Sequence, residues 1–156
     1  MSKILITGGA GFIGSHLTAL LLNQGFSVTV VDNFSYGKRK FLPQNSSSLN
    51  ILEADILDFP SLEKIFVEFQ PETVYHLAAI HHIPTCEKNP VFAFSTNIEG
   101  TEKVVLAAQS AGVKKIVFAS SGAIYDTVDQ ELIEDKTPVI PHDIYSITKR
   151  CGEDII

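Results

Sequence analysis

The stretch "ITGGAGFIGS", residues 6–15, places four glycines directly after a short apolar run. Two registers fit a dinucleotide-binding loop: Gly9-x-Gly11-x-x-Gly14, and the wider Gly8-x-x-Gly11-x-x-Gly14. Glycines allow a tight turn, close approach of the backbone to a pyrophosphate, and close packing of the next helix on the strand. The N-terminus of that helix offers N–H groups and a partial positive charge. The loop predicts a phosphate site, and a ligand-free glycine-rich turn is the alternative.

The rest of the chain alternates between short apolar runs and helical patterns. We expect strands at 3–7, 27–32, 49–55, 73–79 and 114–121, and helices at 12–25, near 60–69, near 91–111 and from about 143. Short, continuously apolar strands separated by helices are typical of a parallel sheet covered on both faces. The sequence therefore predicts an α/β fold, a Rossmann-type doubly wound parallel sheet of order 3-2-1-4-5, with its ligand beyond the carboxyl ends of strands 1 and 4.

Length and composition exclude several classes of protein. The 156 residues predict one domain, residues 1–156, and a formal net charge of −6 argues against a nucleic-acid surface. The apolar runs fall well short of the roughly 20 residues that cross a membrane. Cys86 and Cys151 are too few and too scattered for a disulfide framework or a zinc site. We therefore expect free thiols, no metal and a reducing cytoplasmic location.

Asp32 ends the second expected strand, near the spacing of about 20 residues at which a carboxylate meets the adenosine ribose of a dinucleotide. Each charged hydrogen bond to a ribose diol contributes roughly 1.5–3 kcal/mol. The same carboxylate repels a 2′-phosphate, so NAD is favoured over NADP, with Lys38 and Arg39 as contrary features. An ordinary turn aspartate is the alternative.

Tyr145 and Lys149, in "YSITK", lie one turn apart on the final expected helix and share a face. A phenol has a reference pKa of about 10, and roughly 4 kcal/mol of preference for the phenolate brings it near 7. A neighbouring ammonium and a positive nicotinamide ring can supply that preference. The pair predicts a general base, and a tyrosine stacked over a solvated lysine is the alternative.

Six motifs follow one another along the chain: "TGGAGFIGS", "VVDNFS", "EADILD", "HLAA", "FASSGAIY" and "YSITK". Together they resemble the extended short-chain dehydrogenase/reductase family, and more narrowly its NAD-dependent nucleotide-sugar epimerase/dehydratase branch. The resemblance covers the whole chain. It implies NAD as cofactor and a nucleotide sugar, first of all a UDP-sugar, as substrate.

The resemblance also implies which positions bind the cofactor. The pyrophosphate loop would consist of Gly8, Gly11, Phe12, Ile13 and Gly14. Asp32, Asn33 and Ser35 would hold the adenosine ribose, and Asp55 and Ile56 would flank the adenine. The residues that pass under the cofactor would be Leu77, Ala78 and Ala79. Asn97, in "FSTNIEGT", matches the family's structural asparagine beside the active site and is counted with the cofactor-binding residues.

In the family, the positions of Ser121, Tyr145 and Lys149 are catalytic. Tyr145 would take a proton from a sugar hydroxyl while a hydride passes to the nicotinamide, and Lys149 would also bond the nicotinamide ribose. Ser121 would bond the reacting oxygen. Ser120 is its competitor, and we prefer Ser121 because it stands four residues before Tyr125, as in the family's "SSxxxY" pattern.

The residues after Ser121 bear on the type of reaction. Family dehydratases carry an Asp-Glu pair where this chain has Gly122 and Ala123, so a 4,6-dehydratase is disfavoured. An epimerase is favoured, and a decarboxylase or reductase of related design stays open. His81 and His82 would lie near the site, either as helpers or as ordinary loop histidines.

Three features depart from the family pattern. Asp126 stands where the family has Gly, and Ile144 stands where it often has Pro before the tyrosine. Relatives are also roughly twice as long, so we expect a truncated form that lacks the C-terminal substrate domain, binds NAD, and is weakly active or inactive alone. A standalone NAD-binding module that acts through a partner protein is the alternative. The resemblance further implies a homodimer formed through the helices near 91–111 and from 143.

Overall fold

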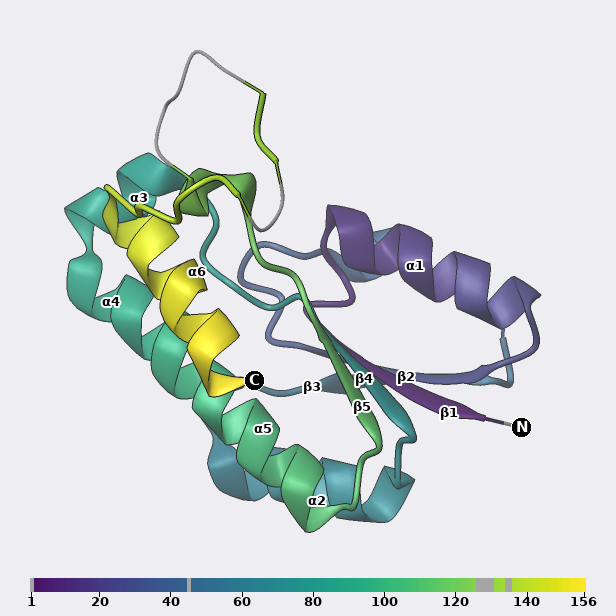
Figure 1. Ribbon diagram of the computed structural model, residues 1–156. Coiled ribbons are helices and arrows are strands. Elements are labelled where there is room, and N and C mark those ends of the chain that lie inside the picture. Colours follow the sequence, from purple (N-terminus) through teal and green to yellow (C-terminus); the bar gives the residue numbers. More distant parts are fainter. Residues whose placement is uncertain (1, 45, 126–130, 134–135) are drawn as a thin grey trace.

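The computed structural model describes residues 2–44, 46–125, 131–133 and 136–156 (Figure 1). Its five strands form one parallel sheet of order β3-β2-β1-β4-β5. They are β1 (Lys3–Thr7), β2 (Ser27–Asp32), β3 (Leu49–Glu53), β4 (Thr73–His76) and β5 (Lys115–Phe118). The predicted Rossmann-type sheet and its strand order are confirmed.

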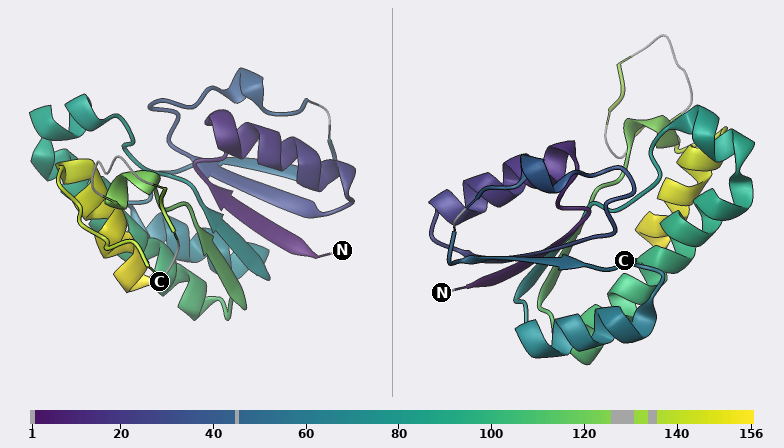
Figure 2. Two further views of the ribbon diagram at one scale, coloured as in Figure 1. Left: turned by 45° about the horizontal axis from the view of Figure 1, so that its top comes forward. Right: turned by 180° about the vertical axis from the view of Figure 1, so that it is seen from behind.

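Helices cover both faces of the sheet (Figures 1 and 2). Successive side chains of a strand point to opposite faces, so an entirely apolar strand feeds two cores. On β1, Ile4 and Ile6 pack with Leu21 of α1 (Phe12–Asn23). Leu5 packs into the other core with Phe66 of α2 (Phe59–Phe69). All four core side chains named here from β1 and α2 are nearly inaccessible to water, which explains why the strands read as continuous apolar runs.

The second helical layer is longer and more broken than predicted. Besides α2, it contains α3 (Ile83–Lys88), α4 (Pro90–Phe94), the π-helical turn η2 (Ser95–Glu99), α5 (Gly100–Ser110) and α6 (Ile144–Ile155). The single helix expected near 91–111 is therefore three consecutive segments, because one π turn changes the backbone pairing without changing the apolar spacing enough to be read. Two short 3-10 turns, η1 (Arg39–Phe41) and η3 (Gly122–Ile124), complete the described elements.

Strands β4 and β5 end earlier than predicted, at His76 and Phe118. The residues that follow them leave the sheet and form the edge at which the predicted ligand site lies. Within the residues that the structure describes, no helix is long and apolar enough to cross a membrane.

Thr29 on β2 carries a polar atom without a hydrogen-bond partner in the described part of the chain. Its side chain is fully buried, and its Oγ1 bonds no described residue. A buried hydroxyl left unpaired costs roughly 1–3 kcal/mol. We expect Thr29→Val, which keeps the branched shape, to raise the free energy of unfolding by about 1 kcal/mol in urea titrations.

Thr18 provides the matched control for that substitution. It is equally buried, but its Oγ1 donates to the Gly14 carbonyl at 2.8 Å. Thr18→Val removes a hydrogen bond that is made and should not stabilise the protein. A lower stability of Thr29→Val than of the unaltered chain would contradict the assignment of an unpaired hydroxyl.

Candidate functional site

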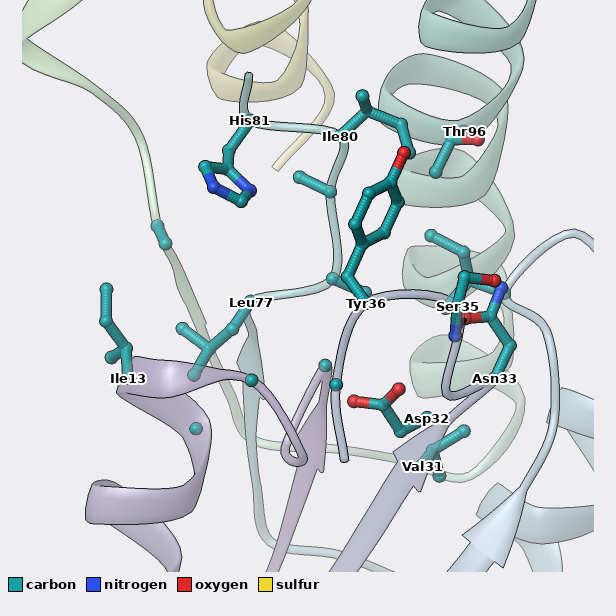
Figure 3. Close-up of a pocket in the computed structure, with 18 of the residues that line it drawn as sticks. Ile13, Val31, Asp32, Asn33, Ser35, Tyr36, Leu77, Ile80, His81 and Thr96 are labelled. Atoms are coloured by element: carbon teal, nitrogen blue, oxygen red, sulfur yellow. Dashed lines mark hydrogen bonds between the residues drawn. The ribbon is translucent and has the colours of Figure 1, made fainter. Parts of the chain in front are cut away.

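A cavity of about 480 Å³ lies at the carboxyl ends of the strands, the size of a small-molecule site (Figure 3). Nearly all of the predicted cofactor-binding residues line it: Gly8, Gly11, Phe12, Ile13, Gly14, Asp32, Asn33, Ser35, Asp55, Ile56, Leu77, Ala78, Ala79, Tyr145 and Lys149. Asn97 and Ser121 are the predicted site residues that do not line it. The fold therefore gathers residues from both ends of the chain at the predicted edge.

The glycine loop is shaped by two close backbone contacts. Gly8 has a φ of 69°, and a Cβ there would lie 2.6 Å from the Ala78 nitrogen. A Cβ on Gly14 would lie 2.5 Å from the Gly8 carbonyl oxygen. Gly9 instead packs against Val30, whereas Gly8, Gly11 and Gly14 line the cavity. The wider of the two registers is therefore the one that faces the cavity.

Asp32 ties this loop to the end of β2. One carboxylate oxygen accepts a hydrogen bond from the Ala10 N–H at 2.9 Å, and the other accepts from the Phe34 N–H at 2.8 Å. Phe34 has a φ of 56°, which turns the chain back toward the carboxylate. Each carboxylate oxygen can accept more than one hydrogen bond, so acceptor capacity remains toward the cavity.

The turn after Asp32 is held by a second carboxylate. Asn33 donates from Nδ2 to Asp55 at 2.9 Å, and its Oδ1 accepts from the Ser35 N–H at 3.0 Å. Arg39 pairs with Glu53 at 3.6 Å and does not line the cavity. Lys38 does not line the cavity either. The two basic residues that favoured NADP in the sequence therefore lie outside the cavity wall.

Sequence reasoning missed several lining residues: Val31, Tyr36, Gly37, Ala54, Ile80, Phe92, Thr96 and Ala119. Figure 3 shows the Tyr36 side chain rising into the space above Asp32. Its backbone is fixed beside the glycine loop, because the neighbouring Lys38 N–H donates to the Ala10 carbonyl at 3.1 Å. The signal available in the sequence was only that Tyr36 follows Ser35 in the same turn.

The start of α6 is built by local hydrogen bonds that place Tyr145 in its first turn. The Asp143 carboxylate accepts from the Ser146 N–H at 2.7 Å, and Ser146 Oγ accepts from the Asp143 N–H at 3.0 Å. Ile144 donates its N–H to Glu87 on α3 at 2.9 Å. A proline could not make that bond, so this departure from the family pattern adds a tie between α3 and α6.

Lys149 lies on the same wall as Tyr145. Its Nζ donates to the Ala119 carbonyl at 2.8 Å and stands 4.7 Å from the Phe118 ring centroid and 6.0 Å from that of Tyr145. Only 4% of Lys149 is exposed, and this burial lowers the pKa of its ammonium from 10.5 to about 8. At pH 7 the group is still about 90% charged. A cation therefore faces the cavity beside the phenol.

Of the two serines that follow β5, Ser120 lines the cavity and Ser121 does not, whereas the sequence favoured Ser121. The Ser120 hydroxyl donates to Glu153 at 2.5 Å. Ser121 Oγ accepts from the Ala123 N–H at 3.1 Å and caps η3. The catalytic role of Ser121 stays a prediction. Asp126, the other departure in this motif, lies outside the described residues.

Asn97 lies behind the wall of the cavity. It is 2% exposed, its Oδ1 accepts from the Ile80 N–H at 2.8 Å, and its Nδ2 donates to the Ile80 carbonyl at 3.0 Å and to Thr148 Oγ1 at 2.9 Å. It thus bonds the protein and presents no surface to a ligand. Asn97 therefore does not contact the cavity as the other expected cofactor-binding residues do, and its structural role stays a prediction.

The two neighbouring histidines, His81 and His82, lie in different surroundings. His81 lines the cavity, as Figure 3 shows, whereas His82 bonds Thr85 Oγ1 at 2.8 Å at the start of α3. Among the residues that the structure describes, no group of three or more His, Cys, Asp or Glu side chains could hold a metal ion.

The relatives of this chain are enzymes of nucleotide-sugar chemistry. It is 34% identical to UDP-glucose 4-epimerase of Bacillus subtilis over 98% of this chain and 46% of the relative. It is 39% identical to UDP-N-acetyl-alpha-D-glucosaminuronate decarboxylase of Bacillus cytotoxicus over 85% of this chain and 40% of the relative. The chain therefore spans about half the length of the curated relatives it matches.

A solved structure gives the same picture. The Bordetella bronchiseptica enzyme WbmG, in complex with NAD and UDP, superimposes with a TM-score of 0.88 at 36% identity, covering 97% of this chain and 48% of that one. The model of the family described as "NAD dependent epimerase/dehydratase family" matches residues 4–156. Together with the strand order and the glycine loop, this match shows that the chain belongs to the NAD dependent epimerase/dehydratase family.

Proposed function

We propose that this chain binds NAD and forms the cofactor-binding half of a nucleotide-sugar epimerase-type enzyme. The observation that carries the proposal is that one cavity has the glycine loop and Asp32 on one side and Tyr145 with Lys149 on another. Sugar-nucleotide relatives covering nearly the whole chain support the substrate class. Because the chain spans about half of their length, we expect these residues to bind NAD and to turn over little substrate alone.

The residues of the cavity fit a dinucleotide. Side chains are excluded at Gly8 and Gly14, where a Cβ would lie within 3 Å of backbone atoms, so that the loop presents backbone to the cavity. The N-terminus of α1 stands at this loop and favours the negative charge of a pyrophosphate. Thr96 lines the cavity with a buried Oγ1 that bonds no other described residue, and a ligand could supply its partner.

Bound NAD would supply a hydride acceptor at its nicotinamide ring. Tyr145 would then accept the proton of a substrate hydroxyl at its phenolic oxygen. Lys149, held by the Ala119 carbonyl, places an ammonium charge on the same wall and favours a negative charge on that oxygen. Gly122 and Ala123 offer no carboxylate for loss of water, so epimerisation is the favoured reaction.

Both cysteines are free, which supports a reducing cytoplasmic location as a further part of the proposal. Cys86 is fully buried beside the Ile80 carbonyl. Burial raises the pKa of its thiol, which keeps the group protonated and unreactive.

NAD affinity should depend on the Asp32 carboxylate. By isothermal titration, the unaltered chain should bind NAD, and Asp32→Ala should weaken binding by more than about tenfold, since at least one charged hydrogen bond to the ribose is lost. Asp58→Ala is the control, because the Asp58 carboxylate likewise accepts from a backbone N–H, that of Ser61 at 3.3 Å, but lies away from the cavity. It should leave the NAD affinity unchanged.

NADP should bind about tenfold or more weakly than NAD, because its 2′-phosphate would meet the Asp32 carboxylate. Equal binding of NADP and NAD, or equal loss in the Asp32 and Asp58 variants, would contradict the proposed ribose site. No binding of NAD at all by the unaltered chain would contradict the proposed function.

The burial of Lys149 should lower the stability of the fold, although the proposed function needs its charge. Its folded pKa of about 8 lies below the 10.5 of the unfolded chain, so the unfolded state binds more protons between these values. Stability from this group therefore rises as pH increases from about 8 to 10.5, by about 3 kcal/mol in total. Lys149→Met should abolish that rise, stabilise the chain at pH 7 by roughly 1–3 kcal/mol, and lose NAD affinity.

Chemical denaturation of both proteins across this pH range measures the difference. Lys64→Met, at an exposed lysine of α2, is the control and should leave the pH dependence unchanged. A Lys149→Met protein with the same rise above pH 8 as the unaltered chain would show that Lys149 is not the titrating group.

An apolar stripe on the second helical layer supports the proposed homodimer. Val91, Phe94 and Leu106 are 78%, 38% and 43% exposed, and Ile98 lies between them at helical spacing. Exposed apolar side chains repeated along one helical layer are a common feature of interfaces. We expect light scattering to show a dimer at a protein concentration of about tens of micromolar, at which a dimer with a micromolar Kd is mostly assembled. Leu106→Glu should give monomers, and Val67→Glu, at an exposed apolar residue of α2, should not.

A further inference from the structure

Behind the cavity wall lies a set of polar side chains that the proposed chemistry does not use. Each is at most 2% exposed, and none lines the cavity: Thr7, His76, Asn97, Thr101 and Thr148. Burying so many polar groups is costly unless their hydrogen bonds are made. In this set they are made, as one connected chain of bonds.

The direction of each bond follows from proton counting. Thr101 Oγ1 lies 2.6 Å from the Asn97 carbonyl, which can only accept, so the single hydroxyl proton of Thr101 points there. Thr101 Oγ1 must then accept from His76 Nε2 at 3.0 Å, which places the imidazole proton on Nε2. His76 Nδ1 in turn accepts from Thr7 Oγ1 at 2.6 Å. Thr7 is left to accept from the Ala78 N–H at 3.4 Å.

A neutral imidazole fits this pattern best, because a protonated ring would carry donors on both nitrogens and leave the Thr7 hydroxyl proton without its acceptor. Burial lowers the pKa of His76 to about 3, with the charge of Lys149 as a second cause. The ring is therefore neutral at any ordinary pH, in agreement with the bond directions.

The same chain of bonds reaches two parts of the cavity. Asn97 lies in the π turn η2, and its side-chain amide bonds both backbone groups of Ile80, a residue of the cavity wall. Its Nδ2 also donates to Thr148 Oγ1, whose own proton goes to the Tyr145 carbonyl at 2.7 Å. One end of the network is thus beside the glycine loop, and the other is on the turn that carries Tyr145.

We propose that Thr101 and His76 are positioning residues of the site, acting through Asn97 to hold the Ile80 wall and the first turn of α6 in register with the cofactor floor. The positioning role rests on the proposed function, whereas the hydrogen bonds are observed independently of it. A polar core that merely stabilised the fold would fix the same imidazole tautomer, but its loss would not act mainly on α6.

The test compares three substitutions in the intact chain. Thr101→Val keeps the shape but removes both the acceptor for His76 and the donor to Asn97. Thr101→Ser keeps the hydroxyl and should therefore preserve the hydrogen bonds that Thr101→Val removes. Thr29→Val makes the same change at a fully buried threonine whose Oγ1 has no partner among the described residues. Imidazole ¹⁵N spectra, amide exchange of α6 and NAD titration are recorded for each.

The unaltered chain should show a neutral imidazole protonated on Nε2. Thr101→Val should lose that signature, exchange the first-turn amides of α6 about tenfold faster, and bind NAD about tenfold more weakly. Thr101→Ser should stay within about threefold of the unaltered chain, and Thr29→Val should match it in imidazole spectrum and NAD affinity and exchange its α6 amides no faster. These differences separate the network from general loosening of the core.

A proton on Nδ1, or an imidazole that titrates near its ordinary pKa in the unaltered chain, would overturn the inference even if no variant folds. So would a Thr101→Val protein with unchanged α6 exchange and NAD affinity, or equal losses in Thr29→Val. Failure of the unaltered chain to bind NAD would contradict the proposed function instead, because the spectra and the exchange are recorded without NAD and test the network separately.

Discussion

The contact between the backbone at Gly8 and the backbone at Ala78 is the constraint on which the rest of the site depends. The ends of β1 and β4, neighbours in the sheet, leave it at this point, and no Cβ fits between them. Because of this close approach, the glycine loop packs directly against the residues that follow β4. Both segments then line the cavity. Asp32 then anchors the same loop from the other side through the Ala10 N–H. Two short contacts therefore determine where the cavity lies.

The cavity combines features that do not favour stability. Lys149 is nearly inaccessible yet carries a cation, and its lowered pKa measures the resulting cost. Thr96 buries a hydroxyl at the wall with no partner among the described residues. By contrast, the threonines and the histidine behind the wall have all their bonds made. A buried cation and an unpaired hydroxyl at the cavity, with satisfied polar groups behind it, are what a binding site on a rigid support requires.

The sheet, its order, the glycine loop and Asp32 were predictable from local signals, whereas most of the other cavity residues were expected only from the family resemblance. A glycine loop after an apolar strand, and an acid at the end of the next strand, fix positions by backbone geometry alone. The π turn at Ser95–Glu99 was not predictable, since it leaves the apolar spacing almost intact. Tyr36 was missed, and Ser120 was ranked behind Ser121, because their places depend on how a turn closes and where a helix packs. The bond from Ile144 to Glu87 likewise joins elements far apart in the sequence.

The central claim is that one dinucleotide spans this cavity from Asp32 to Tyr145. A crystal structure of the chain with NAD tests it most directly. The account predicts the adenosine ribose within hydrogen-bonding distance of the Asp32 carboxylate, the pyrophosphate at the glycine loop, and the nicotinamide beside Tyr145 and Lys149. A cofactor bound elsewhere, or one whose nicotinamide lies away from that pair, would contradict it.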